Sequence, residues 1–242
     1  MTTPKKTLEF HESFRPCRDF IIVMIPLMIM AGYLYGARPL LIFLIAIVEA
    51  FVCDLLSCLL QGKRYDVTDI SSYMFALILV LMLPASVNYG IVLIGVAFTV
   101  LVGKHAFGGY GRYPFHPAAF GFAFINVCFA DAIYLYPRSF SAIGTSWNSG
   151  ATLYAGITNS LKFGGVPSID SVDLFLGNYP GPMGTTFCLI ILACMVLFIV
   201  HKTISWQITL TFLATCAAFS AVFPRVQTGR LDSLVYEMLS GS

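Results

Sequence analysis

The sequence predicts an all-α integral membrane protein with about seven transmembrane segments, several of them broken helices. Of its 242 residues, 58% are hydrophobic and only 11% are charged, whereas a soluble domain carries about 25% charged residues. Apolar runs long enough to cross the hydrocarbon core, which takes about 20 residues, recur along the chain. Prolines and glycines interrupt some of these runs, and a membrane tolerates such breaks only where protein or a watery cavity meets the freed backbone groups. The pattern therefore favours a protein that carries a site over a plain anchor.

The candidate spans divide the chain into five segments. The third span contains Pro84, and the fifth opens with Pro114 and Pro117, so each is expected to be shortened or discontinuous. The spans are expected at 19–36, 39–61, 70–87, 89–105, 115–133, 184–201 and 204–223. The segments are an N-terminal stretch (1–18), a first membrane half with five spans (19–133), a long loop (134–183), the start of a second half with two spans (184–223) and a C-terminal stretch (224–242).

The distribution of Lys and Arg predicts a cytoplasmic N-terminus, because basic residues concentrate in cytoplasmic loops. In that orientation nine of the 14 basic residues lie inside, and the loop 134–183, with only two, lies on the extracytoplasmic side. The basic residues are scattered, so no nucleic-acid partner is predicted. Seven cysteines form no C-x-x-C pair, so no metal site is predicted either.

The loop 134–183 is rich in Gly, Ser, Thr, Asn and Pro and is expected to be irregular. An unstructured loop of more than about 15 residues is usually functional or disordered. It separates five spans from two. This arrangement resembles an incomplete 5+5 inverted-repeat fold of the kind found in transporters, with the loop at the hinge between the halves.

The segment "GKHAFGGYGRYPFHPA" follows the fourth span. It holds four glycines and two prolines in sixteen residues and is not expected to remain a regular helix. Glycine permits positive φ angles, and Pro117 can occupy the start of the next helix without losing a needed donor. The free N–H groups at that helix start would suit an anion or an electron-rich ring. A tight turn between two spans explains the same composition.

A second short motif, Ser149-Gly150-Ala151-Thr152, lies within the long polar loop. Its small residues place a threonine hydroxyl where an enzyme could reach it. Taken alone, the four-residue motif is equally explained as part of an ordinary flexible loop.

Three stretches in this order resemble the NqrB/RnfD family: "GKHAFGGYGRYPFHPAAFG", "SGAT" and "GNYPGPMGTTFCLIILACMVLFIVHKTISWQI". These proteins are membrane subunits of the sodium-pumping quinone reductase and of the Rnf ferredoxin:NAD complex. The chain is most similar to RnfD over about residues 49–207. The resemblance implies FMN bound through a phosphoester to Thr152, with Ser149, Gly150 and Ala151 completing the attachment motif. A flavin transferase attaches the cofactor in this family.

The same resemblance implies an electron-transfer subunit of an Rnf-type complex in the bacterial inner membrane. Its partners would be the other subunits of that complex, and electron transfer would be coupled to Na⁺ or H⁺ movement. It also implies a second, non-covalent flavin in the membrane part. Alternatives are the NqrB-type subunit of a sodium-pumping NADH:quinone reductase, a flavin-free small-solute transporter or channel, and a diverged subunit that only scaffolds its partners.

The chain departs from the family pattern at several positions. Family members usually have Asn-Pro-Phe-Asn-Pro-Ala where this chain has Tyr113 and His116 in place of the asparagines. A Thr-Gly pair in the third span is replaced by Phe75-Ala76, the proline after the flavin threonine by Leu153, and a glutamate by Thr185. These departures concern the second flavin and the ion pathway rather than Thr152.

Two carboxylates fall within the second span, where a charge costs roughly 3 kcal/mol or more. The resemblance places an acidic residue near Glu49, which makes Glu49 the candidate for ion coupling. Asp54 is expected to be protonated or paired, with Lys63 or Arg64 as candidate partners. Lys104 and Arg112 are interpreted as cytoplasmic anchors or as contacts for a flavin phosphate.

Overall fold

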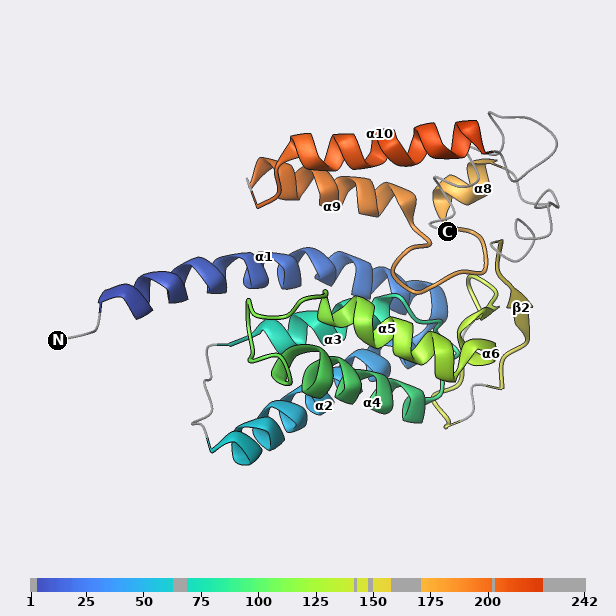
Figure 1. Ribbon diagram of the computed structural model, residues 1–242. Coiled ribbons are helices and arrows are strands. Elements are labelled where there is room, and N and C mark those ends of the chain that lie inside the picture. The colour runs from blue at the N-terminus through green and yellow to red at the C-terminus, as the bar shows by residue number, and fades with distance from the viewer. Residues whose placement is uncertain are drawn as a thin grey trace.

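The computed structural model shows a mostly helical chain (Figure 1). Two helices, α1 (Pro4–Tyr35) and α2 (Ala37–Gln61), form a long hairpin whose turn is Gly36, at a positive φ of 80°. The stretches Pro16–Tyr35 and Ala37–Gln61 are long and apolar enough to cross a membrane. The structure describes residues 4–62, 69–141, 143–147, 150–157, 171–201 and 203–223, with side chains described from residue 16 onward and, within the last helix of the long loop, from residue 173.

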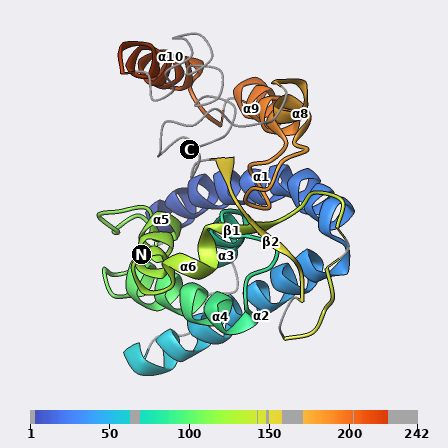
Figure 2. The ribbon, with the colours of Figure 1, turned by 90° about the vertical axis from the view of Figure 1, so that its right-hand side faces the viewer.

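Helix α3 (Ser71–Leu81) forms the centre of the bundle, between α1 and α2 (Figures 1 and 2). Nine of its eleven residues are buried, including the two serines that open it. The helix ends three residues before Pro84, so the break predicted in the third span is confirmed. The following turn leads into α4 (Tyr89–Ala97), whose first turn is capped by the Asn88 side chain accepting from the Gly90 amide at 2.9 Å.

Helix α4 continues without interruption into a π-helix, η1 (Phe98–His105). Segments of π-helix are rare and occur frequently at functional sites. The segment packs tightly on α5 (Pro117–Cys128), because Gly121 leaves room for the Thr99 hydroxyl. A Cβ at Gly121 would lie only 1.8 Å from Thr99 Oγ1, so only glycine allows this approach of the two helices.

The helical fold class is confirmed, but the long loop is not wholly irregular, which corrects its expected character. The short helix α6 (Ala130–Ile133) leads into strand β1 (Leu135–Pro137). Strand β1 pairs antiparallel with β2 (Leu153–Ala155), with Pro137 opposite Leu153. Helix α8 (Ser171–Leu176) lies further along the same segment. The sheet lies at the end of the bundle where α1 turns into α2 (Figures 1 and 2).

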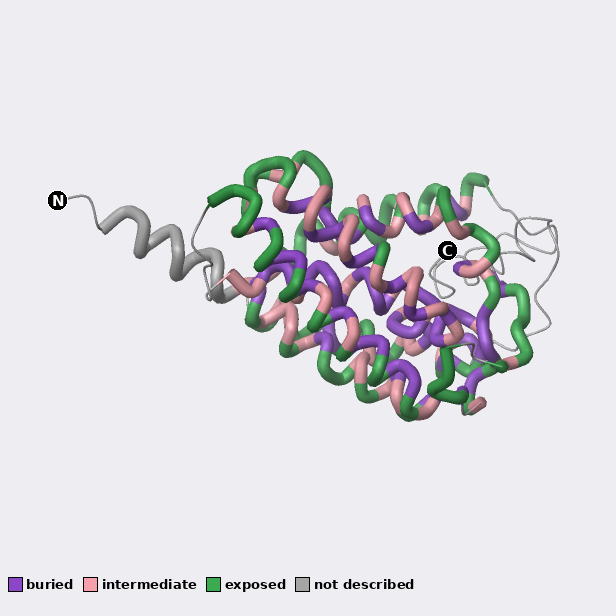
Figure 3. Tube along the Cα trace, turned by 90° about the horizontal axis from the view of Figure 1, so that it is seen from below, coloured by how far each residue is buried: buried purple, intermediate pink, exposed green. Residues whose placement is uncertain are grey.

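The last two helices, α9 (Cys188–Val200) and α10 (Trp206–Val222), have largely exposed apolar side chains. Each contains one buried residue, Cys194 in α9 and Ser220 in α10. In Figure 3 the buried residues gather in the middle of the bundle formed by the earlier helices, and exposed residues line its outside. Exposed apolar area of this extent is typical of a surface that contacts lipid or other protein.

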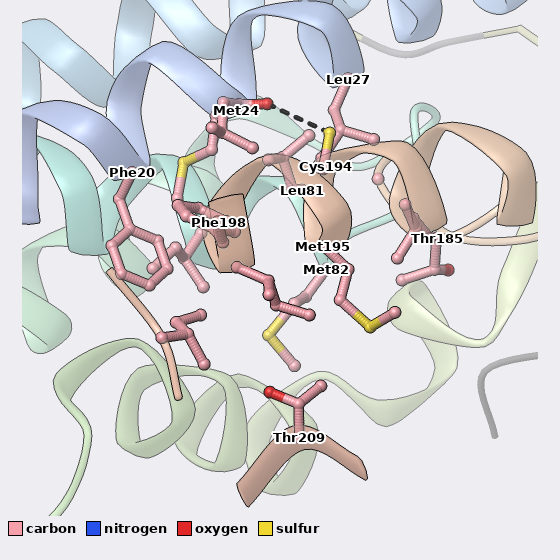
Figure 4. Close-up of a pocket in the computed structure, with 16 residues that line it drawn as sticks. Phe20, Met24, Leu27, Leu81, Met82, Thr185, Cys194, Met195, Phe198 and Thr209 are labelled. Carbon is pink, nitrogen blue, oxygen red and sulfur yellow. Dashed lines mark hydrogen bonds between the residues drawn. The ribbon is translucent and has the colours of Figure 1, made fainter. Parts of the chain in front are cut away.

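An apolar cavity of about 380 Å³ lies between α1, α3 and the α9–α10 pair (Figure 4). Phe20 and Met24 line it from α1, Leu81 from α3 and Met195 from α9. Cys194 also lines the cavity, and its thiol donates a hydrogen bond to the Val23 carbonyl of α1 at 3.6 Å.

Candidate functional site

Thr152 lies at the surface, immediately before strand β2. Gly150 is also exposed and has a positive φ of 59°, and no atom of the described residues lies within 4 Å of the position where its Cβ would be. Ala151 is half-buried and packs against the core. Ser149 is outside the described residues. The Thr152 side chain is thus exposed, between the half-buried Ala151 and strand β2.

A buried arginine binds the segment that precedes this motif and attaches it to the helix bundle. Arg38, the second residue of α2, is 0% exposed. Its guanidinium donates to the carbonyls of Ala85 and Val87, at 3.1 and 3.0 Å, in the turn between α3 and α4. It also donates to three carbonyls of the long loop, those of Gly144 at 2.9 Å, Ser146 at 2.5 Å and Trp147 at 3.4 Å.

Tyr89 reinforces the same contact. The Arg38 guanidinium carbon lies 4.6 Å from the centre of the Tyr89 ring, within the range of a cation–π interaction. The Tyr89 hydroxyl donates to the Thr145 carbonyl at 2.9 Å, and the Trp147 ring meets the Tyr89 ring edge to face. Together these contacts, named here the Arg38 node, join α2, the start of α4 and residues 144–147.

The opposite end of the bundle holds a buried network of charged side chains. Asp54, on α2, is 4% exposed, and Lys104, on η1, is 1% exposed. The Lys104 ammonium lies 2.8 Å from Asp69 Oδ2 and 3.7 Å from Asp54 Oδ1. His105 Nε2 lies 2.6 Å from the same oxygen of Asp54. This group, with the serines that open α3, is called the Lys104 network.

Hydroxyl groups complete the Lys104 network. Ser72 donates to Asp54 at 2.7 Å and accepts from the Lys104 ammonium at 2.5 Å. Asp69 accepts from the backbone amide of Ser71 at 3.1 Å and from its hydroxyl at 2.5 Å. Burial would raise the pKa of Asp69, but the Lys104 ammonium and the two Ser71 hydrogen bonds outweigh burial and lower that pKa below its usual value.

The network corrects the interpretation of Lys104 and agrees with that of Asp54. The sequence predicts that Lys104 is a cytoplasmic anchor or a flavin-phosphate contact, but it is buried and, with His105, meets Asp54 within the bundle. The candidate partners Lys63 and Arg64 lie outside the described residues. Sequence separation hides the pairing, since 50 residues separate Asp54 from Lys104. The position of Lys104 at the end of an apolar run does indicate such a pairing, because a lysine side chain that points into the bundle needs a buried partner.

Glu49 does not share in this network. It is half-buried, and its described hydrogen bond comes from the Cys53 thiol, one helical turn away on α2, at 3.5 Å. A thiol is a weak donor. The carboxylate is therefore less tightly held than Asp54.

The glycine-rich segment forms a turn from residue 106 to residue 116, as its composition predicts. Gly108, Gly109 and Gly111 all have positive φ angles, and α5 begins at Pro117. The turn brings together three positions that depart from the family pattern. The Phe75 ring is fully buried, and Tyr113 and His116 meet it edge to face, with centroid distances of 5.5 and 5.2 Å.

These features define a helical membrane protein with one buried ionic network and one loop segment anchored by an arginine at the other end of the bundle. The chain belongs to the NQR2, RnfD, RnfE family, whose model matches residues 11–242.

Relatives in three organisms support this assignment. The D subunit of the ion-translocating oxidoreductase complex of Methanosarcina acetivorans is 26% identical over 203 residues, 84% of this chain and 61% of the relative. The D subunit of the proton-translocating ferredoxin:NAD(+) oxidoreductase complex of Clostridium ljungdahlii is 24% identical over 225 residues, 91% of this chain and 68% of the relative. The B subunit of the Na(+)-translocating NADH-quinone reductase of Pseudomonas aeruginosa is 30% identical over 174 residues, 66% of this chain and 39% of the relative. The chain thus spans 61% of the length of the Methanosarcina relative.

Proposed function

We propose that this chain is a membrane subunit of an Rnf-type ion-translocating ferredoxin:NAD oxidoreductase, and that it carries FMN as a phosphoester on Thr152. Family membership and the names of the Methanosarcina and Clostridium relatives support the complex. The observation that carries the cofactor assignment is the exposed Thr152 side chain beside Gly150, where the surface is open.

The surroundings of Thr152 suit the attachment of a nucleotide. The hydroxyl supplies the ester oxygen, and the small side chain of Ala151 does not obstruct a flavin transferase. When bound, the flavin supplies one- and two-electron redox chemistry, and the covalent link keeps it at one place in the relay. The chain's own part is to present the hydroxyl and to hold the segment around it.

Co-expression with a flavin transferase tests the cofactor assignment. We expect the intact mass of the purified chain to increase by one FMN, and the denatured band to fluoresce in a gel. Thr152→Ala should lose both signals, whereas Thr145→Ala, an exposed threonine seven residues earlier in the same segment, should keep them. A non-fluorescent wild-type chain in the presence of the transferase would instead favour the flavin-free transporter.

Thr152 is proposed to face the extracytoplasmic side of the bacterial inner membrane. The distribution of basic residues supports this orientation, with a cytoplasmic N-terminus. A membrane-impermeant maleimide added to intact cells should label a Thr152→Cys variant above the background of the native cysteines. Labelling only after the cells are opened would place Thr152 inside.

Glu49 is proposed to serve ion coupling. A half-buried carboxylate whose hydrogen bond, among the described residues, comes from a weak thiol donor can exchange a proton or bind a cation more readily than one in a closed network. In the assembled complex, Glu49→Gln should reduce ion transport per electron transferred. An unchanged ratio would remove Glu49 from the pathway.

The resemblance implies a second, non-covalent flavin, and the departures from the family pattern at Phe75, Tyr113 and His116 bear on whether this chain binds it. Packed rings occupy these positions in this chain. Extraction of the purified protein with acid would release a non-covalent flavin, whereas the flavin on Thr152 would stay with the protein. The flavin content of the supernatant and of the precipitate therefore measures the two separately.

Membership of a sodium-pumping quinone reductase is the second candidate function, and the 30% identity to the Pseudomonas relative favours it. The activity of the purified native complex distinguishes the two candidate functions. An Rnf-type complex reduces NAD with ferredoxin, whereas a sodium-pumping quinone reductase oxidises NADH with a quinone.

A further inference from the structure

We propose that Arg38 is the positioning residue of the flavin-bearing segment: it fastens residues 144–147 to the helix bundle and thereby sets where Thr152 is presented. The effect of Arg38 on flavin attachment rests on the proposed function. That Arg38 holds residues 144–147 rests on the contacts of the Arg38 node alone.

The contacts of Arg38 are those of a backbone clamp rather than of an ion pair. Arg38 is fully buried, and no carboxylate pairs with it among the residues for which side chains are described. Its donors instead meet five backbone carbonyls. An arginine has five N–H donors in a rigid fork, which suits this task, and hydrogen bonds from a charged donor are about twice as strong as neutral ones.

The five carbonyls come from two different parts of the chain. Two belong to the α3–α4 turn, which is part of the core, and three belong to the loop. A loop without regular structure leaves carbonyl groups unpaired, and burying them without a donor is costly. The arginine satisfies both sets at once, so a single side chain, supported by Tyr89, joins residues 144–147 to the α3–α4 turn.

Thr152 lies between two fixed points of the loop and is itself exposed. On its N-terminal side, the Ile143 amide donates to the Tyr35 carbonyl at 3.2 Å, and the Arg38 node holds residues 144–147. On its C-terminal side, β2 pairs with β1. Without Arg38, the motif would still be held by strand β2 and by the contact of Ala151 with the core, but residues 144–147 would lose their attachment to the bundle.

Hydrogen–deuterium exchange of the full chain in lipid nanodiscs tests the structural part without any flavin. In Arg38→Met, exchange in the peptide covering 143–147 should rise at least tenfold, since the Ile143 amide bond to the Tyr35 carbonyl opens more often once residues 144–147 are no longer held. Exchange in α3 and α5 should stay within about twofold of the wild type. Arg38→Lys, which keeps the charge but not the fork, should give an intermediate rise. Arg138→Met removes an exposed arginine of the same loop and should change nothing.

Unchanged exchange at 143–147 in a folded Arg38→Met chain would overturn the proposal, as would an equal rise throughout the bundle. If Arg38→Met does not fold, Tyr89→Phe replaces it: removal of the hydroxyl bond to Thr145 should raise exchange at 143–147 about threefold or more, and no rise would again overturn the proposal.

Flavin attachment tests the functional part. With the transferase co-expressed for a short, fixed time, Arg38→Met should carry at least threefold less FMN per folded chain than the wild type or Arg138→Met. Equal attachment alongside raised exchange would disprove the link to flavin transfer. A wild-type chain without FMN would refute the proposed function, while the exchange result would still decide whether Arg38 holds the loop.

Discussion

Two cations are buried at opposite ends of the same helix bundle, and they are held in different ways. The Lys104 ammonium meets two carboxylates, and the Arg38 guanidinium meets five carbonyls and an aromatic ring. Asp54 and Arg38 are both on α2, about 24 Å apart along its axis at 1.5 Å per residue. One helix thus carries both groups, at opposite ends of the bundle.

The difference follows from what each cation has to bind. The Lys104 network joins helices whose backbone groups are already paired, so its partners must be side chains, and charge balances charge. The Arg38 node joins a loop whose carbonyls lack helix partners, so a multiple donor serves better than a counter-ion. A buried cation in a membrane protein can therefore serve either helix packing or loop placement, and its partners show which.

The largest effect is expected where a buried charge loses its counter-charge. Lys104→Met leaves Asp54 and Asp69 without the ammonium and should lower the free energy of unfolding by about 3–5 kcal/mol. Unfolding in mixed micelles with increasing SDS measures this quantity. Arg112→Met, an exposed cation eight residues later, should change it by less than about 0.5 kcal/mol. Similar small losses in both variants would show that the network contributes little.

A smaller effect is expected from the hydroxyl that bridges the network. Ser72→Ala removes one donor from Asp54 and one acceptor from Lys104, and should cost about 1–3 kcal/mol in the same assay. Ser86→Ala removes a less buried hydroxyl bonded to the Leu135 carbonyl at 3.3 Å and is the matched control. If both serine variants behave alike, Ser72 is not a bridge between the charges.

A still smaller effect is expected at the Arg38 node when only its support is weakened. Tyr89→Phe keeps the ring beside Arg38 but loses the hydrogen bond to the Thr145 carbonyl, which corresponds to about 0.5–1.5 kcal/mol. Thermal unfolding followed by tryptophan fluorescence measures it, since Trp147 belongs to the node. Tyr154→Phe, on exposed strand β2, should leave the transition unchanged.

The smallest effect on the free energy of unfolding is expected from acidification, and it should distinguish the Lys104 network from the Arg38 node. The pKa of Asp69 is below its usual value in the folded chain, so its ionised form stabilises the fold at neutral pH. That contribution is lost only as the pH falls below about 4, where the unfolded carboxyl takes up its proton first. Unfolding curves from about pH 7 to about pH 3 should show this loss in the wild type and less of it in Asp69→Asn. The Arg38 node has no carboxylate among its described contacts, so Trp147 fluorescence should not report an early acid transition.

Several features of the fold are predictable because they depend on local chemistry. Pro84, Pro117 and the glycines at 108, 109 and 111 lie where breaks are expected, and the structure has its breaks there. Composition alone is not decisive, because Pro16 and Pro26 lie inside α1. The apolar character of the long helices is equally clear from composition. The short β1–β2 pair escapes prediction because three-residue strands have too little pattern to distinguish them from loop.

Local sequence patterns are enough to show that this chain is helical, apolar and interrupted at defined places, and the Ser-Gly-Ala-Thr motif points to Thr152. The roles of Arg38 and Lys104 follow only from the three-dimensional arrangement. Counted along the chain, both are single basic residues near the ends of apolar runs. Their roles depend on which side chains and carbonyls lie within about 4 Å, and those partners come from segments 32 to 109 residues away. Coulombic and hydrogen-bond energies fall steeply with distance and not with sequence separation, so only the folded chain reveals them.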